Sequence, residues 1–386
     1  MPTGRTVLVA GFSARALARS ALAAGFRVAV VDGFGDRDLL EPAPPLVAHR
    51  TVRPFDPDRA AQAAASLPAD AVVYTSNLEN HPEAVARLAV GRTLLGNPPE
   101  VLVAVRNAGR LVRALEAAGL PAAQVYDGAD QEATSRTDGA FLVKPCRSGG
   151  GFGIRRWRAG EPLGEGELLQ EWIDGVPASL MFAADGAEVL ALGLTRQLIG
   201  EAAFGARDFH WCGNLLGGAG VDVLPRAHEV LTGAVAAAGA VTRAFGLRGV
   251  NGIDFIARDG EAVVIEVNPR WTAAMELAER ARGTSLFPTH VAACEGRLEE
   301  PPGPRAGACQ GKAVACTPLD STAPNTDAWL ADADIRDVPA PGSELPQGSP
   351  ICTVFAEAPT DEACHAALIR RARDVITAVA SMPPPR

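Results

Sequence analysis

The chain of 386 residues lacks the sequence features that define several large classes of protein. It contains no run of about 18 uncharged apolar residues, so the sequence predicts no transmembrane helix. Lysine and arginine form no cluster and the formal net charge is −9, which argues against a nucleic-acid-binding surface. With 47% apolar and 21% charged residues, the composition is that of a globular protein.

The seven cysteines also lack a recognisable pattern. They include no Cys-x-x-Cys pair and show no spacing typical of metal ligands. Scattered cysteines are typical of proteins whose thiols stay reduced and mostly pack against other side chains. We therefore expect a cytoplasmic protein.

The beginning of the chain predicts an alternation of strands and helices. Residues 5–10 and 27–32 are short apolar runs, and an Ala/Leu-rich helical stretch between them ends at Gly25. This order predicts a parallel sheet. A dinucleotide site is disfavoured, because the stretch after Gly11 lacks the second and third glycines that let a pyrophosphate approach the backbone. We interpret the region as a structural or substrate-facing half-Rossmann domain, with Glu79 and Asn80 following a later strand over 71–74.

Proline and glycine divide the rest of the chain. Gly96-Asn-Pro-Pro99 closes the first domain, and Pro301-Pro-Gly-Pro304 precedes the last segment. We therefore expect domains over residues 1–98, 99–300 and 301–386. Apolar spacing predicts helices over about 100–118, 226–246 and 361–380, and strands over 140–144, 167–173, 312–316 and 350–355.

The most informative stretch is residues 251–270, in which two apolar runs flank a turn at Asp259 and Gly260. Such runs predict two antiparallel strands. Side chains alternate between the faces of a strand, so Glu266 and Asn268 share a face. A three-residue loop over 259–261 would place Asp254 directly opposite Glu266.

Asp254, Glu266 and Asn268 would then converge among Ile, Val and Phe residues. A carboxylate in such surroundings needs a compensating cation. Oxygen ligands alone suit Mg²⁺, which keeps waters and substrate phosphates as its other partners. The sequence therefore predicts a magnesium site, with Mn²⁺ as a substitute. The alternative is a hairpin with solvated acids on its outer face, which the neighbouring Arg270 disfavours.

A second candidate is the glycine-rich stretch from Ser148 to Gly153. Its backbone N–H groups are unobstructed by side chains and could hold an anion. It is not a Walker loop, because no Gly-Lys-Ser/Thr follows. Lys144 lies on the strand before it, and this combination suits a triphosphate. A simple turn beside a solvated lysine remains the alternative.

The third candidate is the segment from Gln170 to Gly175, at the end of a predicted strand. A segment that links two lobes can present one backbone donor and one acceptor to adenine, and Glu171 could accept from the exocyclic amine. By itself, the segment could equally be an ordinary half-exposed strand.

These motifs together resemble the ATP-grasp superfamily over about residues 5–300. Lys144 precedes a glycine-rich loop, Gln170-Glu171 is followed by Gly175, and Asp254 precedes Glu266-Val-Asn-Pro-Arg270. The group includes biotin carboxylase, carbamoyl-phosphate synthetase, the purine-pathway carboxylases and D-alanine–D-alanine ligase. The resemblance implies an α/β ATP-grasp fold with an N-terminal half-Rossmann domain, a small lobe at about 120–173 and a large lobe at about 174–300. The segment from about 305 is similar to the small α+β C-terminal domain of carboxylase-like members.

The resemblance also implies roles for the candidate residues. ATP would lie between the lobes, with Lys144 and Arg270 as catalytic residues. Lys144 would bind the phosphates, and Arg270 would stabilise the transferred phosphoryl group or the acyl phosphate. Asp254 stands where relatives have Glu or Gln. A basic residue of relatives falls on Ala108 here, so Arg106 or Arg110 must substitute. The implied nucleotide-binding residues are Arg106, Lys144, Ser148, Gly149, Gly150, Gly151, Gly153, Gln170, Glu171, Trp172 and Ile173.

Two contacts are less well defined. An acidic ribose ligand is missing after Gly175, where Ala178 and Ser179 stand instead. The family places substrate contacts between the hinge and the hairpin, which here includes residues 195–197 and 208–214. A surface loop with a packed tryptophan is the alternative, and no partner identifies His210 as a general base. The substrate candidates are Arg196, His210, Trp211 and Asn214.

The expected function is an ATP-dependent ligase that joins a small-molecule carboxylate to an amine or a thiol, through an acyl phosphate, and releases ADP and phosphate. An ATP-dependent carboxylase using bicarbonate is the alternative enzyme, although no biotinyl Met-Lys-Met motif occurs. A non-catalytic nucleotide-binding regulator is a third hypothesis, which the complete set of metal and phosphate residues opposes. Small molecules are the expected partners, neither nucleic acid nor membrane is expected, and a homodimer is left open.

Overall fold

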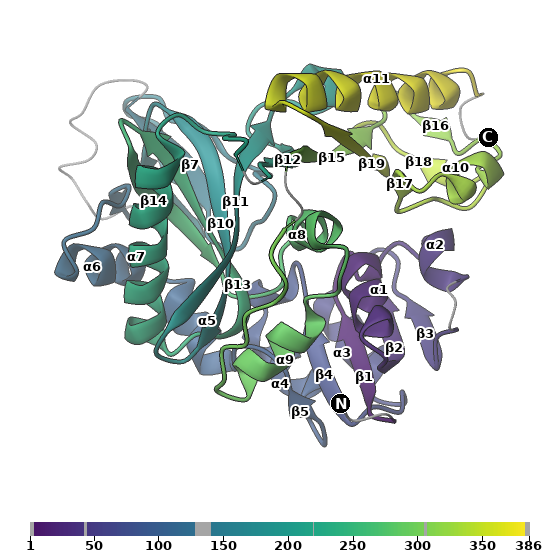
Figure 1. Ribbon diagram of the computed structural model, residues 1–386, viewed down its shortest axis with the longest axis horizontal. Coiled ribbons are helices and arrows are strands. Elements are labelled where there is room, and N and C mark those ends of the chain that lie inside the picture. The colour runs from purple at the N-terminus through teal and green to yellow at the C-terminus, as the bar shows by residue number, and fades with distance from the viewer. Residues whose placement is uncertain (1–3, 42–44, 128–139, 219, 305–306, 383–386) are drawn as a thin grey trace.

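The computed structural model describes residues 4–41, 45–127, 140–218, 220–304 and 307–382 (Figure 1). Its N-terminal part is a parallel sheet in the order β3-β2-β1-β4-β5. Apolar side chains of β1 pack on α1 on one face and on α3 on the other, which explains why the strands are continuous apolar runs. The elements of this part are β1 (Thr6–Ala10), α1 (Arg15–Ala23), β2 (Arg27–Asp32), α2 (Arg37–Leu40), β3 (Ala48–Thr51), α3 (Pro57–Ala64), β4 (Ala71–Tyr74), η1 (Leu78–Asn80), α4 (Pro82–Leu88) and β5 (Thr93–Leu94).

The order of this sheet reverses between β1 and β4. In open α/β sheets, the crevice outside the carboxyl ends of the strands at such a reversal is the usual place for a ligand. Helix η1, which contains Glu79 and Asn80, follows β4 at this edge. The N-terminal sheet is therefore positioned to contribute side chains to a site that it shares with the rest of the chain.

The predicted single helix over 100–118 is wrong, because the structure has two helices, α5 (Pro99–Val105) and α6 (Ala108–Ala117). Asn107 adopts an extended conformation, and its side chain accepts a hydrogen bond from the backbone N–H of Arg110. An asparagine in this position begins a new helix. The break leaves Arg106 at the junction of the two helices.

A small four-stranded sheet follows, in the order β6-β9-β7-β8. Its core consists of Phe141, Val143, Trp157 and Leu169, so the glycine-rich loop between β7 and β8 is anchored at both ends to a packed sheet. The strands are β6 (Val125–Tyr126), β7 (Phe141–Pro145), β8 (Arg155–Arg156) and β9 (Glu167–Glu171).

The largest sheet has the order β14-β13-β10-β11-β12-β15-β19-β17, and all its pairs are antiparallel. Helix α7 packs over the β10–β14 part, and α11 packs on β15 and β19, which continue the same sheet toward the C-terminus (Figure 1). Its elements are β10 (Val176–Asp185), β11 (Val189–Ile199), η3 (Ala202–Phe204), β12 (Trp211–Leu216), α7 (Ala227–Phe245), β13 (Arg248–Arg258), β14 (Glu261–Asn268), β15 (Cys309–Cys316), β17 (Ile335–Arg336), β19 (Pro350–Ala358) and α11 (Asp361–Ala380).

The remaining elements surround this sheet. Helices α8 (Met275–Arg282) and α9 (Phe287–Cys294) share an apolar core with the N-terminal sheet. A two-stranded sheet of β16 (Ser321–Thr322) and β18 (Glu344–Leu345) and helix α10 (Asp327–Ala331) complete the C-terminal part. No helix in the described ranges is long and apolar enough to cross a membrane.

The β13–β14 hairpin has the predicted pairing for a different reason. Arg258 pairs with Glu261, so the turn contains two residues, Asp259 and Gly260, and the predicted three-residue loop is wrong. Both turn residues have positive φ, as the tight turns that match strand twist require. The register then shifts between Asp254 and Phe255, and this bulge restores the expected pairing of Asp254 with Glu266.

Candidate active site

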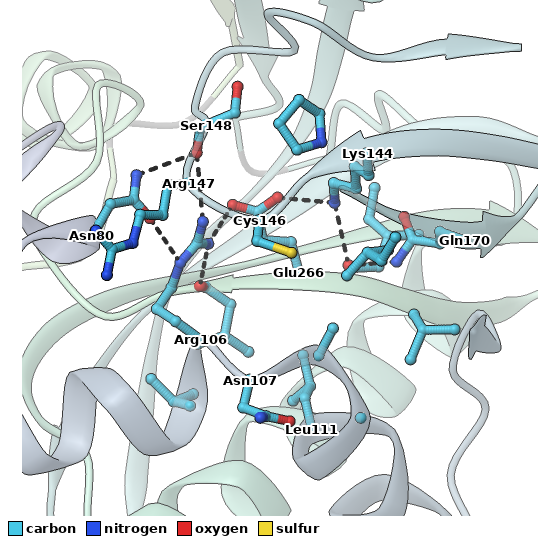
Figure 2. Close-up of a pocket in the computed structure, with 18 of the residues that line it drawn as sticks. Asn80, Arg106, Asn107, Leu111, Lys144, Cys146, Arg147, Ser148, Gln170 and Glu266 are labelled. Carbon is cyan, nitrogen blue, oxygen red and sulfur yellow. Dashed lines mark hydrogen bonds and ion pairs between the residues drawn. The ribbon is translucent and has the colours of Figure 1, made fainter. Parts of the chain in front are cut away.

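A cavity of about 710 Å³ lies between the small sheet, helices α5 and α6, and strand β14 (Figure 2). The glycine-rich loop and residues Glu79 and Asn80 of η1 also line it. Several predicted site residues meet here although they come from distant parts of the sequence. Those that line the cavity are Arg106, Lys144, Ser148, Gly149, Gly150, Gly151, Gln170 and Glu266.

Glu266 is bound by two cations inside this cavity. Arg106 Nη1 lies 2.6 Å from its Oε1, and Lys144 Nζ lies 2.9 Å from its Oε2 (Figure 2). Burial alone would raise the pKa of Glu266, but the charges of Lys144 and Arg106 outweigh it and hold this pKa below its usual range. The carboxylate is therefore ionised, and both groups expected to bind phosphate are paired with it.

Asp254 lies opposite Glu266 but has neutral partners. Gln197 Nε2 donates to its Oδ1 at 3.1 Å, and Asn268 Nδ2 donates to its Oδ2 at 2.8 Å. Burial and the charge of Glu266 raise the pKa of Asp254 to about 6. Within the described part of the chain it forms no ion pair. Of the two facing carboxylates, Glu266 is therefore neutralised by two cations, whereas Asp254 has only neutral hydrogen-bond donors among the described residues.

The oxygen donors around this pair suit a hard divalent cation. Asp254 and Glu266 are adjacent carboxylates, and the repulsion between them contributes to the raised pKa of Asp254. A cation between them would remove that repulsion, and carboxylate and amide oxygens are ligands that Mg²⁺ prefers. The residues therefore fit the predicted metal, provided that Arg106 and Lys144 move away from Glu266 when the ion binds.

Arg270 is held from three sides. Its Nε donates to Glu79 Oε1 at 2.7 Å, its Nη2 to Asn268 Oδ1 at 3.2 Å, and its Nη1 to the backbone oxygen of Trp271 at 3.2 Å. The guanidinium is largely buried beside the acidic pair. Arg270 thus links the hairpin to the N-terminal sheet.

Either of two arginines was expected to substitute for the basic residue that is missing at Ala108, and of these Arg106 lines the cavity. Besides Glu266, Arg106 contacts Asn80 Oδ1 through Nε at 3.1 Å and the backbone oxygen of Ser148 through Nη2 at 3.3 Å. Arg110 lies 5.9 Å above the ring of Phe245, outside the set of residues that line the cavity. Of the two arginines, only Arg106 is available to a ligand in the cavity.

The glycine-rich loop packs against residues 209–211. The backbone N–H of Trp211 donates to the oxygen of Gly150 at 3.0 Å, and the rings of Phe152 and His210 lie 4.2 Å apart. Gly151 has φ of 79°, and a Cβ there would overlap the backbone oxygen of Phe209. Glycine is therefore required for this close approach.

The segment from Gln170 to Gly175, predicted to link the two lobes and contact adenine, lies only partly at the cavity. Gln170 lines it and donates from Nε2 to the oxygen of Ile265 at 2.9 Å. The backbone N–H groups of Glu171 and Trp172 donate to Gln124 and Ala140, both at 2.8 Å, within the small sheet. Glu171, Trp172, Ile173 and Gly153 are not among the described residues that line the cavity.

None of the four substrate candidates is among the described residues that line the cavity: Arg196, His210, Trp211 and Asn214. Gln197 faces Asp254, so the alternation of β11 turns Arg196 to the opposite face, where its Nη2 lies 3.4 Å from Asp361 Oδ2. Asn214 is buried, donates to Thr195 Oγ1 and accepts from Trp211 Nε1. The structure does not bring these side chains to the cavity.

The candidate site residues chosen from the sequence did not include Glu79, Asn80 and Gln197, whose side chains contact Arg270, Arg106 and Asp254 respectively. Glu79 and Asn80 had one usable signal, their place at the carboxyl end of a buried strand. Gln197 belongs to the segment 195–197 named for substrate contacts, but its contact with Asp254 depends on the pairing of β11 and β13 with β10, which the sequence does not reveal.

Comparison with known proteins identifies the domain that contains most of this site, apart from Glu79 and Asn80. Residues 106–274 match the family model of the ATP-grasp domain, so the chain contains a domain of that family. This assignment confirms the expected family, fold class and cofactors, ATP and Mg²⁺. No curated protein matches the sequence.

Solved structures share the fold over nearly the whole chain. An L-amino acid ligase from Bacillus licheniformis has a TM-score of 0.70 and 14% identity, with 97% of this chain and 98% of that chain covered. An N5-carboxyaminoimidazole ribonucleotide synthetase from Thermotoga maritima has a TM-score of 0.68, 15% identity and coverage of 96% and 98%. A biotin carboxylase from Campylobacter jejuni has a TM-score of 0.68, 16% identity and coverage of 96% and 91%. At these identities, the similarity establishes the fold alone.

Proposed function

We propose that this chain is an ATP-dependent ligase that joins a small-molecule carboxylate to an amine through an acyl phosphate, with release of ADP and phosphate. The observation that supports this most directly is the arrangement around Glu266. Glu266 lines the cavity, is paired with Arg106 and Lys144, and faces a second carboxylate, Asp254, across the hairpin. Phosphoryl transfer depends on such a combination of cations and metal ligands.

The residues divide into two groups by their contacts. Arg106 and Lys144 would bind the phosphates once they leave Glu266, and the backbone N–H groups of the 148–153 loop would supply further donors. Asp254, Glu266 and Asn268 would hold Mg²⁺. When bound, the metal would neutralise charge on the phosphate oxygens.

Arg270 would act at the transferred group. Its contacts to Glu79, Asn268 and Trp271 fix the guanidinium beside the metal ligands. A substrate carboxylate oxygen would attack the γ-phosphorus, and the bond to ADP would break. The amine would then attack the acyl carbon, phosphate would leave, and the nitrogen would lose a proton. A fixed positive charge near the phosphoryl oxygens would stabilise the transition state of both steps and so lower their activation free energies.

The same residues are compatible with a carboxylase that activates bicarbonate. Chains of similar fold include both an amino acid ligase and carboxylating enzymes, so the fold does not favour one of them. A carboxylate–thiol ligase also uses the same first step. The identity of the acceptor therefore has to be found by assay.

The assay is ADP release from ATP and Mg²⁺ in the presence of separate carboxylates, amines and bicarbonate. The proteinogenic amino acids form a suitable first panel, because each offers both a carboxylate and an amine. ADP release that requires an amine supports the ligase, and release that requires bicarbonate alone supports the carboxylase. Nucleotide binding without ADP release under any combination would contradict both and favour a regulator.

A further inference from the structure

Glu79 belongs to the N-terminal part of the chain, yet its carboxylate lies beside Arg270. It is the middle residue of η1, which follows strand β4 at the edge where the sheet order reverses. Its Oε1 accepts from Arg270 Nε at 2.7 Å, and only 2% of the Glu79 side chain is exposed. The pair therefore joins two segments that are 191 residues apart.

Glu79 supplies the one charged contact among the three that fix Arg270. The other two acceptors, Asn268 Oδ1 and the backbone oxygen of Trp271, are neutral. A guanidinium is planar, so contacts at Nε and at both terminal nitrogens determine its orientation as well as its position. Charge-assisted hydrogen bonds are stronger than neutral ones, so Glu79 contributes most to this orientation.

The second carboxylate oxygen, Oε2, is buried and has no hydrogen-bond partner in the described part of the chain. A buried carboxylate with half of its hydrogen-bonding capacity unused destabilises a fold more than an apolar residue of similar size. Folding alone therefore does not account for a glutamate at this position. A buried unsatisfied group of this kind calls for an explanation, and a role in a reaction is one.

The neighbouring Asn80 indicates that η1 as a whole contacts the phosphate-binding residues. Asn80 Oδ1 accepts from Arg106 Nε, and Asn80 Nδ2 donates to the backbone oxygen of Ser148 (Figure 2). Two consecutive residues of the N-terminal part thus touch Arg270, Arg106 and the glycine-rich loop. The N-terminal sheet completes the site.

We propose that Glu79 is a positioning residue, which holds the guanidinium of Arg270 in the orientation that phosphoryl transfer requires. This inference rests on the proposed function. It assigns a role in the reaction to the N-terminal part, outside the matched residues 106–274. Glu79 acts through Arg270 and does not itself contact the reacting atoms.

The test compares Glu79→Ala with Glu79→Gln, because the amide oxygen of glutamine can still accept from Arg270 Nε. Glu83→Gln is the matched control, since Glu83 is exposed four residues further on and its ion pair is with the half-buried His81. The measurements are kcat and the KM for ATP with substrates that the wild type turns over, and the unfolding temperature. We expect Glu79→Ala to lower kcat by about tenfold or more. Glu79→Gln should have a smaller effect and Glu83→Gln almost none.

The KM for ATP should stay within about twofold of the wild-type value. Glu79→Ala leaves Arg270 largely buried without its carboxylate partner, so this variant should unfold at a lower temperature than the wild type. The kinetic constants are therefore measured well below the unfolding temperatures of all the variants. Wild-type kcat in Glu79→Ala would overturn the inference and leave the proposed function intact. A loss of kcat that disappears when wild type and variant are both assayed well below their unfolding temperatures would also overturn it, because Glu79 would then act on stability alone. Absence of ADP formation by the wild type with every substrate would overturn the proposed function and this inference together.

Discussion

Two glutamates in this chain, Glu266 and Glu276, are each bound by one arginine and one lysine. In both, the two cations outweigh the effect of burial and hold the pKa below its usual range. Their surroundings differ, since Glu266 lines the cavity and Glu276 does not. The comparison shows that an ion-pair pattern alone does not distinguish a structural junction from a site that can receive a ligand.

The Glu276 cluster is sealed between three parts of the chain. Glu276, on α8, pairs with Arg15 of α1 and, at 2.7 Å, with Lys312 of β15. Arg15 also contacts Asp337 of the C-terminal part at 2.8 Å. The side chains of Arg15 and Lys312 are only 2% and 4% exposed. Because no ligand can reach these cations, their pairing serves to hold the parts together.

In the Glu266 cluster the two cations are more exposed, and the neighbouring carboxylate, Asp254, has no cationic partner among the described residues. Arg106 and Lys144 are each 15% exposed and border the cavity. Across the hairpin, Asp254 has neutral hydrogen-bond partners and a raised pKa. A phosphate could draw the two cations away, and a metal ion could then take their place between the acids. The access of Arg106 and Lys144 to the cavity is what separates this cluster from the sealed one.

The largest effect on stability is expected from Glu276→Gln. The change leaves Arg15 and Lys312 buried without their shared counter-charge, and breaking a buried ion pair in this way costs about 3–5 kcal/mol. Urea unfolding should show that loss in the free energy of unfolding. The control is Glu295→Gln, in which an exposed pair with Arg297 is broken. Equal stability of the two variants would contradict the sealed-cluster interpretation.

Glu266→Gln should act on turnover. It removes a carboxylate from the proposed metal site, so we expect kcat to fall by about a hundredfold or more. Stability should fall less than in Glu276→Gln, because water in the cavity can solvate Arg106 and Lys144. ADP formation and urea unfolding are the two measurements, with Glu261→Gln on the same strand as the exposed control. Near-normal ADP formation would contradict the metal assignment.

A smaller, pH-dependent effect is expected at Glu279, one turn after Glu276. Burial raises the pKa of Glu279 to about 7, while Ser20 and the backbone N–H of Leu286 donate to its Oε1. The folded chain then keeps a proton that the unfolded chain has lost, so stability is highest below the ordinary glutamate pKa and falls as pH rises through about 7.

Glu279→Gln keeps the accepting oxygen and removes the titration. The wild type should lose on the order of 2 kcal/mol more than this variant between about pH 5 and about pH 8, after allowance for partial exposure. Urea unfolding at several pH values measures the difference. A variant whose pH dependence matches that of the wild type would show that Glu279 does not titrate in this range.

Local sequence patterns predicted the elements well where apolar runs had clear ends. Strands β2 and β4 and helix α11 have the expected residues. The helix over 100–118 was misjudged, because apolar spacing continues across Asn107 although its side chain begins a new helix. The hairpin register was correct through two compensating errors, since neither the two-residue turn nor the bulge at Ile265 was foreseen.

The site was predictable to the extent that it lies on continuous motifs. Lys144, the glycine-rich loop and Glu266 are local patterns that meet at the cavity, and Asp254 pairs with Glu266 across the hairpin. Glu79 and Gln197 depend on contacts between distant segments, which no periodicity encodes. The same limit explains why Arg196 was chosen as a substrate candidate although it does not line the cavity. The alternation of side chains along a strand does not reveal which of its faces borders the cavity.

The most direct test of the proposed function follows an oxygen atom through the reaction. A substrate carboxylate labelled with ¹⁸O, incubated with ATP, Mg²⁺ and the amine, should transfer one labelled oxygen to inorganic phosphate. That result, together with ADP as the nucleotide product, is what an acyl phosphate intermediate predicts. Unlabelled phosphate, or release of AMP and pyrophosphate with the label in AMP, would contradict the mechanism and indicate a different activation of the carboxylate.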